Sequence, residues 1–241
     1  MRLAKNHLDI GLFTNDIDTH KIFWEKDIGL TLDHKLELTQ DITQHRYEVH
    51  GSVIKVNHAS EELETKAMSG YTGLTVCGDQ ETTWTGRTPE GEKVRIVKLG
   101  TAGIVGIGIT LSTQDPEKMM QFYTEVMRFD KISSSVARCG DSLLFVEEGP
   151  SGTPSDDFVG SGFRYITVQI FDADQTCSDI ERRGGIIAKP PVNLGKVARY
   201  AFATDPDGNW IEISARTSLT GVEPRSRPHR RLVTRAPPPP G

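Results

Sequence analysis

Apolar and polar residues alternate in short runs along most of this chain, and the runs recur in a repeating order. Residues 8–24 and 107–123 each contain a strand-like apolar run, then an aspartate, then an aromatic pair seven residues further on. The aspartates are Asp16 and Asp115. Aspartate is a favoured helix N-cap because its carboxylate accepts the free amides of the first turn. Each segment is therefore predicted to be a strand followed by a helix.

Short strands follow each of these helices, and two further units begin with a strand of their own. The candidate short strands lie around residues 30–38, 43–50, 52–58, 130–136 and 142–148. The further units begin at residues 71–79 and 163–185, and the matching closing strands lie at 88–99 and 205–216. Period-two alternation bounded by turn residues is typical of strands in a small meander. The chain therefore contains four related βαβββ modules, and the second is abbreviated because residues 79–87 leave little room for a helix.

A β-sheet unit of this size cannot bury its apolar face alone, so the modules must close on each other in pairs. The sequence predicts an α+β fold built from tandem paired βαβββ modules. Residues 1–100 are expected to form a degenerate scaffold domain, and residues 101–216 a second domain that contains the active cavity. Residues 217–241 are basic and rich in proline, which predicts a flexible tail.

Composition narrows the class of partner. The 241 residues carry a formal net charge of −5, so no overall basic field favours nucleic acid or an anionic membrane. No apolar run approaches the roughly 20 residues that span a bilayer, and the first residues do not resemble a signal peptide. The expected protein is cytoplasmic and binds a small molecule.

One polar turn leads into a strand with a carboxylate in its middle. The turn is the sequence DPDGN at residues 205–209, and the carboxylate belongs to Glu212. With the repeats and the helix starts at Asp115 and Asp172, this motif resembles the vicinal oxygen chelate superfamily, which includes glyoxalase I, bleomycin-binding proteins and extradiol dioxygenases. The resemblance implies paired modules that curl around a cavity, a Glu212 side chain that points into it, and possible assembly as a homodimer.

The resemblance also implies a place for a metal. In metal-binding members of the superfamily one ligand lies on the first strand of each module, and a glutamate like Glu212 lies on the last. At the matching first-strand positions of the second domain, Gly108 and Tyr165 stand where histidine would be expected. Residues 59–228 contain no histidine, so the second domain cannot assemble the two-histidine, one-carboxylate set of non-haem iron enzymes.

The first domain offers no better set, because Asp9, Gly73 and Arg95 hold its corresponding positions. No metal ligands are therefore assigned and no cofactor is expected. Divalent Fe, Mn or Zn would bind only at a site shared between modules one and four, where His7 and Asp9 could join Glu212.

Several side chains are candidates for chemistry on a small substrate. Glu212 is assigned as general base, and Tyr165 as the group that exchanges a proton with the reacting oxygen. The candidate substrate-binding residues are Arg199, Lys55, Asn57, His45 and Glu147. Lys55 and Asn57 share one face of a strand, and Arg199 could hold an anion with its planar fork. Each of them could instead be a solvated outer-face residue.

These residues suit proton abstraction next to a carbonyl, so the leading hypothesis is an isomerase, epimerase or lyase. Its substrate would be an oxygenated, anionic small molecule with a carbonyl or an aromatic ring. One alternative is a ligand-binding protein without catalysis, like the bleomycin-resistance proteins. The other is a dioxygenase-like or glyoxalase-like metal enzyme whose site is shared between modules one and four.

Overall fold

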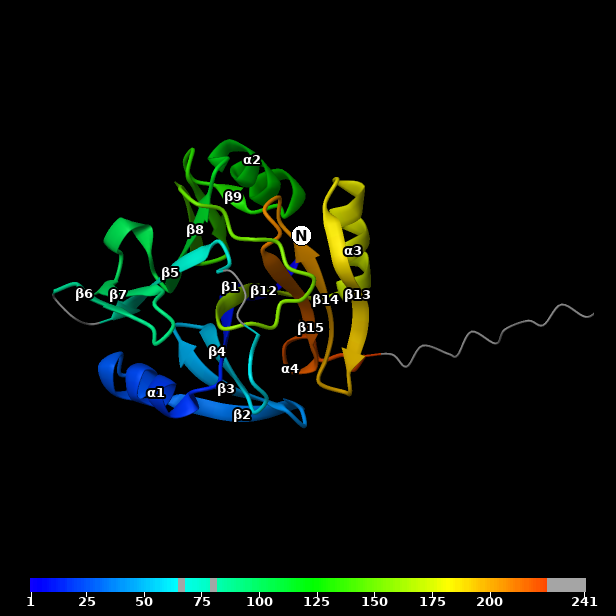
Figure 1. Ribbon diagram of the computed structural model, residues 1–241. Coiled ribbons are helices and arrows are strands. Elements are labelled where there is room, and N and C mark those ends of the chain that lie inside the picture. Colours follow the sequence, from blue (N-terminus) through cyan, green and yellow to red (C-terminus); the bar gives the residue numbers. More distant parts are fainter. Residues whose placement is uncertain (65–67, 79–81, 225–241) are drawn as a thin grey trace, which may run out of the picture.

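The computed structural model describes residues 1–64, 68–78 and 82–224, and consists of two curled β-sheets with short helices packed on them (Figure 1). The α+β fold and the paired βαβββ modules predicted from the sequence are confirmed. The predicted flexible tail falls largely on residues 225–241, which lie outside the described residues. No helix in the described part of the chain is long and apolar enough to cross a membrane.

The elements follow the predicted order in each module. Module one contains β1 (Leu3–Thr14), α1 (Ile17–Lys21), the π-helix η1 (Ile22–Asp27), β2 (Leu32–Thr39), β3 (Ile42–Val49) and β4 (Ser52–Ala59). Module two contains β5 (Tyr71–Gly78), β6 (Trp84–Arg87) and β7 (Lys93–Lys98), and the short 3₁₀ turn η2 (Thr101–Gly103) follows it. Within the described residues this module has no helix between its strands, as its abbreviated sequence predicts.

The second half of the chain repeats the pattern with complete helices. Module three contains β8 (Ile107–Thr113), α2 (Pro116–Gln121), the π-helix η3 (Phe122–Val126), β9 (Asp130–Lys131), β10 (Val136–Cys139) and β11 (Ser142–Glu148). Module four contains β12 (Gly162–Ile170), α3 (Ala173–Arg182), β13 (Ile186–Leu194), β14 (Ala198–Thr204) and β15 (Trp210–Arg216), and α4 (Thr217–Thr220) follows.

The predicted aspartate caps are present at the start of all three module helices. The carboxylates of Asp16, Asp115 and Asp172 each accept a backbone amide of the first turn at 3.0 Å. Each cap satisfies an amide that the helix itself leaves without a partner. The caps fix where the chain leaves the first strand of the module and turns onto the sheet.

The outer modules one and four share one sheet, and the inner modules two and three share the other. The eight-stranded sheet has the order β13-β14-β15-β12-β1-β4-β3-β2, and the seven-stranded sheet has the order β6-β7-β5-β8-β11-β10-β9. Module one is thus joined to module four through the antiparallel pair β1 and β12, and module two to module three through β5 and β8. The sheets cross the domain boundary expected between residues 100 and 101, because β1 pairs with β12 rather than with β5.

Alternation along the central strands separates a core face from a cavity face. On β1, Leu8, Ile10 and Leu12 belong to the main core cluster, whereas Phe13 belongs to a smaller aromatic cluster with Tyr165. The main cluster also includes residues of both sheets and of the helices. Because strand side chains point alternately to opposite faces, the other face of the large sheet is left to line a hollow.

Candidate functional site

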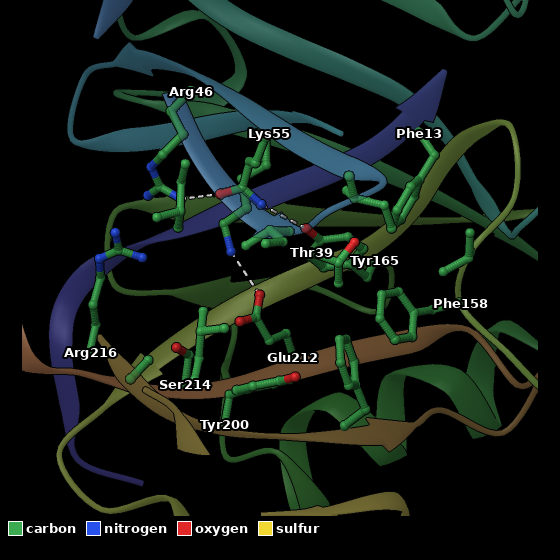
Figure 2. Close-up of a pocket in the computed structure, with 18 of the residues that line it drawn as sticks. Phe13, Thr39, Arg46, Lys55, Phe158, Tyr165, Tyr200, Glu212, Ser214 and Arg216 are labelled. Carbon is green, nitrogen blue, oxygen red and sulfur yellow. Dashed lines mark hydrogen bonds and ion pairs between the residues drawn. The ribbon is translucent and has the colours of Figure 1, made fainter. Parts of the chain in front are cut away.

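The hollow of the eight-stranded sheet is a cavity built by modules one and four (Figure 2). It has a volume of about 150 Å³ and is lined from β1, β2, β3, β4, β12, β13, β14 and β15, and from the loop that precedes β12. Its wall is mostly apolar, with a few polar and charged side chains. Enclosed, mainly apolar pockets with few convergent polar groups are typical of small-molecule sites.

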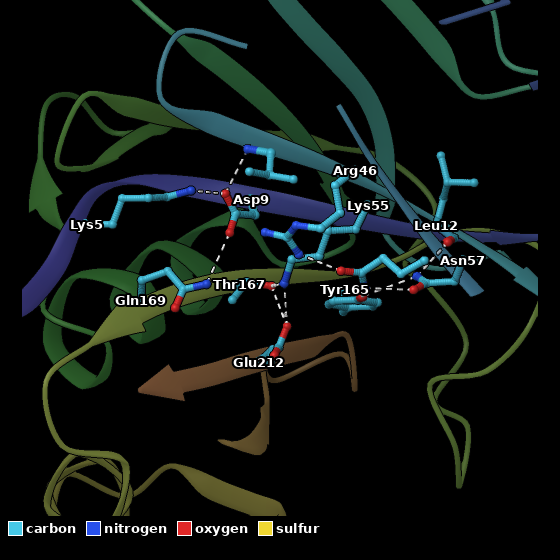
Figure 3. Close-up of polar contacts among 12 residues, drawn as sticks. Lys5, Asp9, Leu12, Arg46, Lys55, Asn57, Tyr165, Thr167, Gln169 and Glu212 are labelled. Carbon is cyan, nitrogen blue, oxygen red and sulfur yellow. Dashed lines mark hydrogen bonds and ion pairs between the residues drawn. The ribbon is translucent and has the colours of Figure 1, made fainter. Parts of the chain in front are cut away.

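A lysine, a threonine and a glutamate meet on the wall of this cavity (Figure 3). The Nζ atom of Lys55 lies 2.7 Å from Oε2 of Glu212 and 2.6 Å from Oγ1 of Thr167. The hydroxyl of Thr167 donates to the same Oε2 atom at 2.7 Å. Within the described residues, Oε1 of Glu212 receives no hydrogen bond. One carboxylate oxygen is thus fixed, and the other is open to a ligand.

The strand register explains why these side chains meet. Thr167 and Glu212 are register partners on the parallel strands β12 and β15, and Gly11 and Lys55 are partners on β1 and β4. The antiparallel pair β1 and β12 brings the two halves together at the centre of the sheet. Gly11 is required there, because a Cβ atom at that position would lie 2.2 Å from the ring of Tyr165.

Lys55 is buried, with only 4% of its side chain exposed. Burial lowers the pKa of its ammonium below the usual range, although Glu212 and Asp9 oppose this shift with their negative charges. An ammonium has three N–H donors, and Thr167 and Glu212 accept two of them. The third donor of Lys55 is available to an oxygen atom of a bound molecule.

A second buried carboxylate lies next to this group. Asp9 accepts hydrogen bonds from Lys5, from the amide of Val53 at 2.8 Å and from Gln169 at 3.3 Å. Burial alone would raise its pKa, but the positive charges of Lys5 and Lys55 outweigh burial and hold the pKa below the ordinary value. Asp9 is therefore ionised, and its hydrogen bonds to Lys5, Val53 and Gln169 hold it in place.

Tyr165 places its phenol at the other side of the cluster. Its hydroxyl oxygen accepts a hydrogen bond from Asn57 at 3.2 Å, and Asn57 also donates to the Leu12 carbonyl at 2.8 Å. Burial, followed by the negative charge of Glu212, raises the pKa of Tyr165 well above its usual value. The phenol therefore keeps its proton and can donate it in a hydrogen bond, but it is a poor base.

The structure brings together some of the residues singled out from the sequence. Glu212, Tyr165 and Lys55 all line the cavity. Asn57 lies behind Tyr165 and holds its hydroxyl, so it supports the cavity wall. Their functional roles stay proposals: Lys55 contacts Glu212, whereas Asn57, on the same face of β4, contacts Tyr165.

Three other candidates lie away from the cavity. Arg199 donates to both carboxylate oxygens of Asp174, at 2.5 and 2.7 Å, because its side chain points toward α3. His45 points to the opposite face of β3 from the cavity-lining residues, and burial followed by the charge of Lys35 lowers its pKa to about 4. Glu147 lies on the seven-stranded sheet and lines a separate surface hollow. These placements correct the expectation that all three would line the cavity that holds Glu212.

Sequence reasoning missed two arginines that line the cavity, Arg46 and Arg216. Arg46 is the register partner of Lys55 on the neighbouring strand, and Arg216 follows Glu212 by four residues on β15. Register partners on neighbouring strands share a face of the sheet, and so do residues four apart on one strand, so each arginine lies on the same face as its charged neighbour. That signal becomes useful only once β3 and β15 are known to border one cavity.

The side chains in this cavity do not fit the metal site that the superfamily resemblance implies. The described residues contain no cluster of three or more histidine, cysteine, aspartate or glutamate side chains suited to hold a metal ion. Lys55, a cation, is bound to Glu212, the one carboxylate that matches the expected ligands. His7 packs against Gly51 and lies 3.9 Å from Asp141, so it does not join Glu212 as the shared-site alternative requires.

The fold and the cavity together are those of a protein in which paired βαβββ modules curl around a hollow. Comparison with known proteins agrees: the profile of the Glyoxalase/Bleomycin resistance protein/Dioxygenase superfamily matches residues 106–213. A probable lactoylglutathione lyase of Synechocystis is 30% identical over 114 residues, which are 41% of this chain and 86% of that protein. A probable lactoylglutathione lyase of Vibrio cholerae is 28% identical over 116 residues, 43% of this chain and 84% of that protein. The chain belongs to this superfamily.

Solved structures extend the likeness in fold to nearly the whole chain. Glyoxalase I from Zea mays has a TM-score of 0.67 at 12% identity and covers 91% of this chain and 94% of its own. A putative dioxygenase from Bacillus subtilis has a TM-score of 0.62 at 13% identity, with 89% and 86% covered. At these identities the likeness concerns the fold alone.

Proposed function

We propose that the protein is an enzyme that removes a proton next to a carbonyl group of a small anionic molecule. The observation that carries the proposal is the cluster of Lys55, Thr167 and Glu212 on the cavity wall, with one carboxylate oxygen left open. The reaction type is isomerisation, epimerisation or elimination. Relatives named probable lactoylglutathione lyases support a lyase-type reaction.

Each member of the cluster has a distinct part in this proposal. Oε1 of Glu212 is the base that takes the proton, since Oε2 is held by Lys55 and Thr167. The free N–H of Lys55 and the phenol proton of Tyr165 donate to the carbonyl oxygen, where negative charge develops as the proton leaves. Donors that are fixed before the reaction stabilise this charge without reorganising. No step in this scheme requires a metal ion.

The experiment is a search for hydrogen exchange, which detects proton removal whatever the final product. Carboxylic acids with an acidic C–H next to a carbonyl are incubated with the protein in D₂O, and deuterium incorporation is followed by proton NMR. The wild type should speed exchange for a subset of them, and Glu212→Gln should lower that rate by about 10²-fold or more. Glu148→Gln is the matched control, because Glu148 is exposed at the end of β11 on the other sheet.

A second candidate function is a binding protein without catalysis. It is favoured by the ion pair that engages Glu212 and by the aromatic side chains near it, such as Phe158 stacked on Phe202 with ring centroids 4.2 Å apart. Saturable binding by the wild type and by Glu212→Gln, with no exchange by either, would support this function and refute the enzyme. A homodimer and a cytoplasmic location also stay predictions, and sedimentation analysis tests the first.

A further inference from the structure

The charged groups that face the cavity are not balanced. On the cavity wall Lys55 is paired with Glu212, and the buried Asp9, which does not line the cavity, is paired with Lys5. Arg46 and Arg216 line the same cavity, and within the described residues neither has a carboxylate partner. Two guanidinium charges therefore remain after the acidic groups have been matched. An arginine side chain stays protonated at all ordinary pH values, so these charges cannot be lost.

Arg46 is held in a position that leaves some of its donors without a partner. The residue is only 5% exposed, and its Nη1 donates to Oε1 of Gln44 at 2.5 Å. Its Nε is buried and has no hydrogen-bond partner. A buried charged donor without a partner is costly, because it has lost water and gained nothing in exchange. The Nε atom has almost no accessible surface, so an anion in the cavity would offset the charge of Arg46 through the rest of the guanidinium group, which lines the cavity.

Arg216 lies close enough to Arg46 for the two positive charges to interact. Burial lowers the pKa of its guanidinium and the positive charge of Arg46 lowers it further, whereas the negative charges of Glu212 and Asp9 oppose this shift without cancelling it. Two like charges that face one hollow repel each other, and an anion between them converts that repulsion into attraction. Planar guanidinium groups are well matched to the oxygens of a carboxylate, which they can bind in a bidentate manner.

The other end of the cavity has the opposite character. Phe13 packs in a triangle with two aromatic neighbours, with ring centroids 5.9 Å from Phe158 and 6.2 Å from Tyr165. Figure 2 shows Arg46 and Arg216 at one end, Phe13 and Phe158 at the other, and Lys55 and Glu212 between them. A ligand that fills the cavity must therefore be charged at one end and apolar at the other.

We propose that Arg46 and Arg216 form an anion subsite, and that the ligand is a small carboxylic acid whose flat apolar group lies against Phe13 and Phe158. This inference names the substrate class of the proposed enzyme. The proposed proton removal would act on this ligand, but binding of the ligand does not depend on catalysis, because a binding protein could use the same subsite. The carboxylate end fixes the ligand in one direction. The middle of the ligand is thereby placed next to Lys55 and Glu212.

Calorimetric titration with phenylacetate tests the subsite without any need for turnover. Phenylacetamide has the ring without the charge, acetate has the charge without the ring, and phenyl phosphate carries a different anion. Phenylacetate should bind more tightly than phenylacetamide and acetate. Tighter binding of phenyl phosphate would contradict the carboxylate assignment. Equal binding of phenylacetamide and phenylacetate would overturn the anion subsite.

The variants Arg46→Gln and Arg216→Gln should each weaken phenylacetate binding by about tenfold or more, the effect of losing a hydrogen bond to a charged group. They should leave phenylacetamide binding unchanged. Arg138→Gln is the control, since Arg138 is exposed and pairs with Asp130 on the other sheet. If Arg46→Gln does not fold, the more exposed Arg216 carries the test alone. Unchanged phenylacetate binding in Arg216→Gln would overturn the subsite. The Glu212→Gln variant tests the proposed reaction instead, because it should lose turnover and still bind phenylacetate.

Discussion

Removing the charge of Glu212 leaves the Lys55 ammonium in a buried place without its counterion. The exposed fractions of the two side chains are 4% for Lys55 and 15% for Glu212. Breaking a buried ion pair from one side costs about 3–5 kcal/mol, and the partial exposure of Glu212 favours the lower end, about 3 kcal/mol for Glu212→Gln. Lys55→Met leaves the more exposed partner behind and should cost somewhat less, about 2 kcal/mol.

The double variant Lys55→Met/Glu212→Gln removes both charges, so it should be less destabilised than the sum of the single variants. The expected coupling free energy is about 2 kcal/mol, within the range for residues in direct contact. Urea unfolding followed by circular dichroism measures all four proteins. A loss of about 3 kcal/mol corresponds to a fall in melting temperature of roughly 6–12 °C for a chain of this size.

The stability difference between wild type and Glu212→Gln should also depend on pH, because it involves the protonation of Lys55. The folded-state pKa of Lys55 lies below the ordinary value of 10.5, so its burial destabilises the fold while both states are protonated. This cost disappears as pH rises from the folded pKa toward the unfolded one. In Glu212→Gln the pKa of Lys55 falls further, because the carboxylate that raises it is gone. The stability gap between wild type and Glu212→Gln should therefore shrink as pH is raised from neutrality.

The control is Asp130→Asn, which removes one partner of an exposed pair with Arg138. Exposed ion pairs contribute little to stability, so this variant should unfold at nearly the wild-type urea concentration. If Glu212→Gln were no less stable than Asp130→Asn, or if the single effects simply added in the double variant, the buried pair would be refuted.

Three further predictions concern stability and use urea unfolding as the readout. Gly11→Ala puts a Cβ atom 2.2 Å from the ring of Tyr165, and overpacking of this kind should cost about 2 kcal/mol; an unchanged midpoint would contradict the close packing. Burial raises the pKa of Asp205 from its ordinary value of 3.8 to about 6, so the folded wild type binds the proton more tightly than the unfolded chain and should lose stability as pH rises from 3.8 to about 6. Asp205→Asn lacks this loss, and its stability relative to wild type should improve over the same interval; the opposite trend would argue against the burial. Thr167→Val should cost about 1–2 kcal/mol by removing the hydroxyl bound to Glu212, whereas Thr167→Ser should keep most of that stability.

The sequence predicts the modules well because their signals are local. An aspartate cap such as Asp115 acts within one helical turn, and alternation is a property of a single strand. The pairing of module one with module four is different, since it depends on how the edge of β1 fits β12 across most of the chain. For this reason the sequence indicated a cavity with Glu212 but placed it within the second half of the chain.

For the candidate residues too, the sequence predicts properties within one strand better than contacts between strands. Lys55 and Glu212 could be singled out as charged residues in strands, yet their contact required two strands far apart in sequence. Arg199 looked equally suitable from its strand, but Asp174 on the neighbouring helix binds it instead. Arg46 was overlooked because a charged residue on one strand carries no local sign of which hollow it faces.

The most direct test of the central claim is an NMR titration of the Lys55 ammonium, observed through its ¹⁵N nucleus and assigned with Lys55→Met. Module one supplies Lys55 and module four supplies Glu212, so coupling between them shows that the modules meet at one buried pair. We predict that Lys55 titrates below the ordinary lysine value and that Glu212→Gln lowers its pKa further. A Lys55 that titrates at the ordinary value, with no response to Glu212→Gln, would contradict the account.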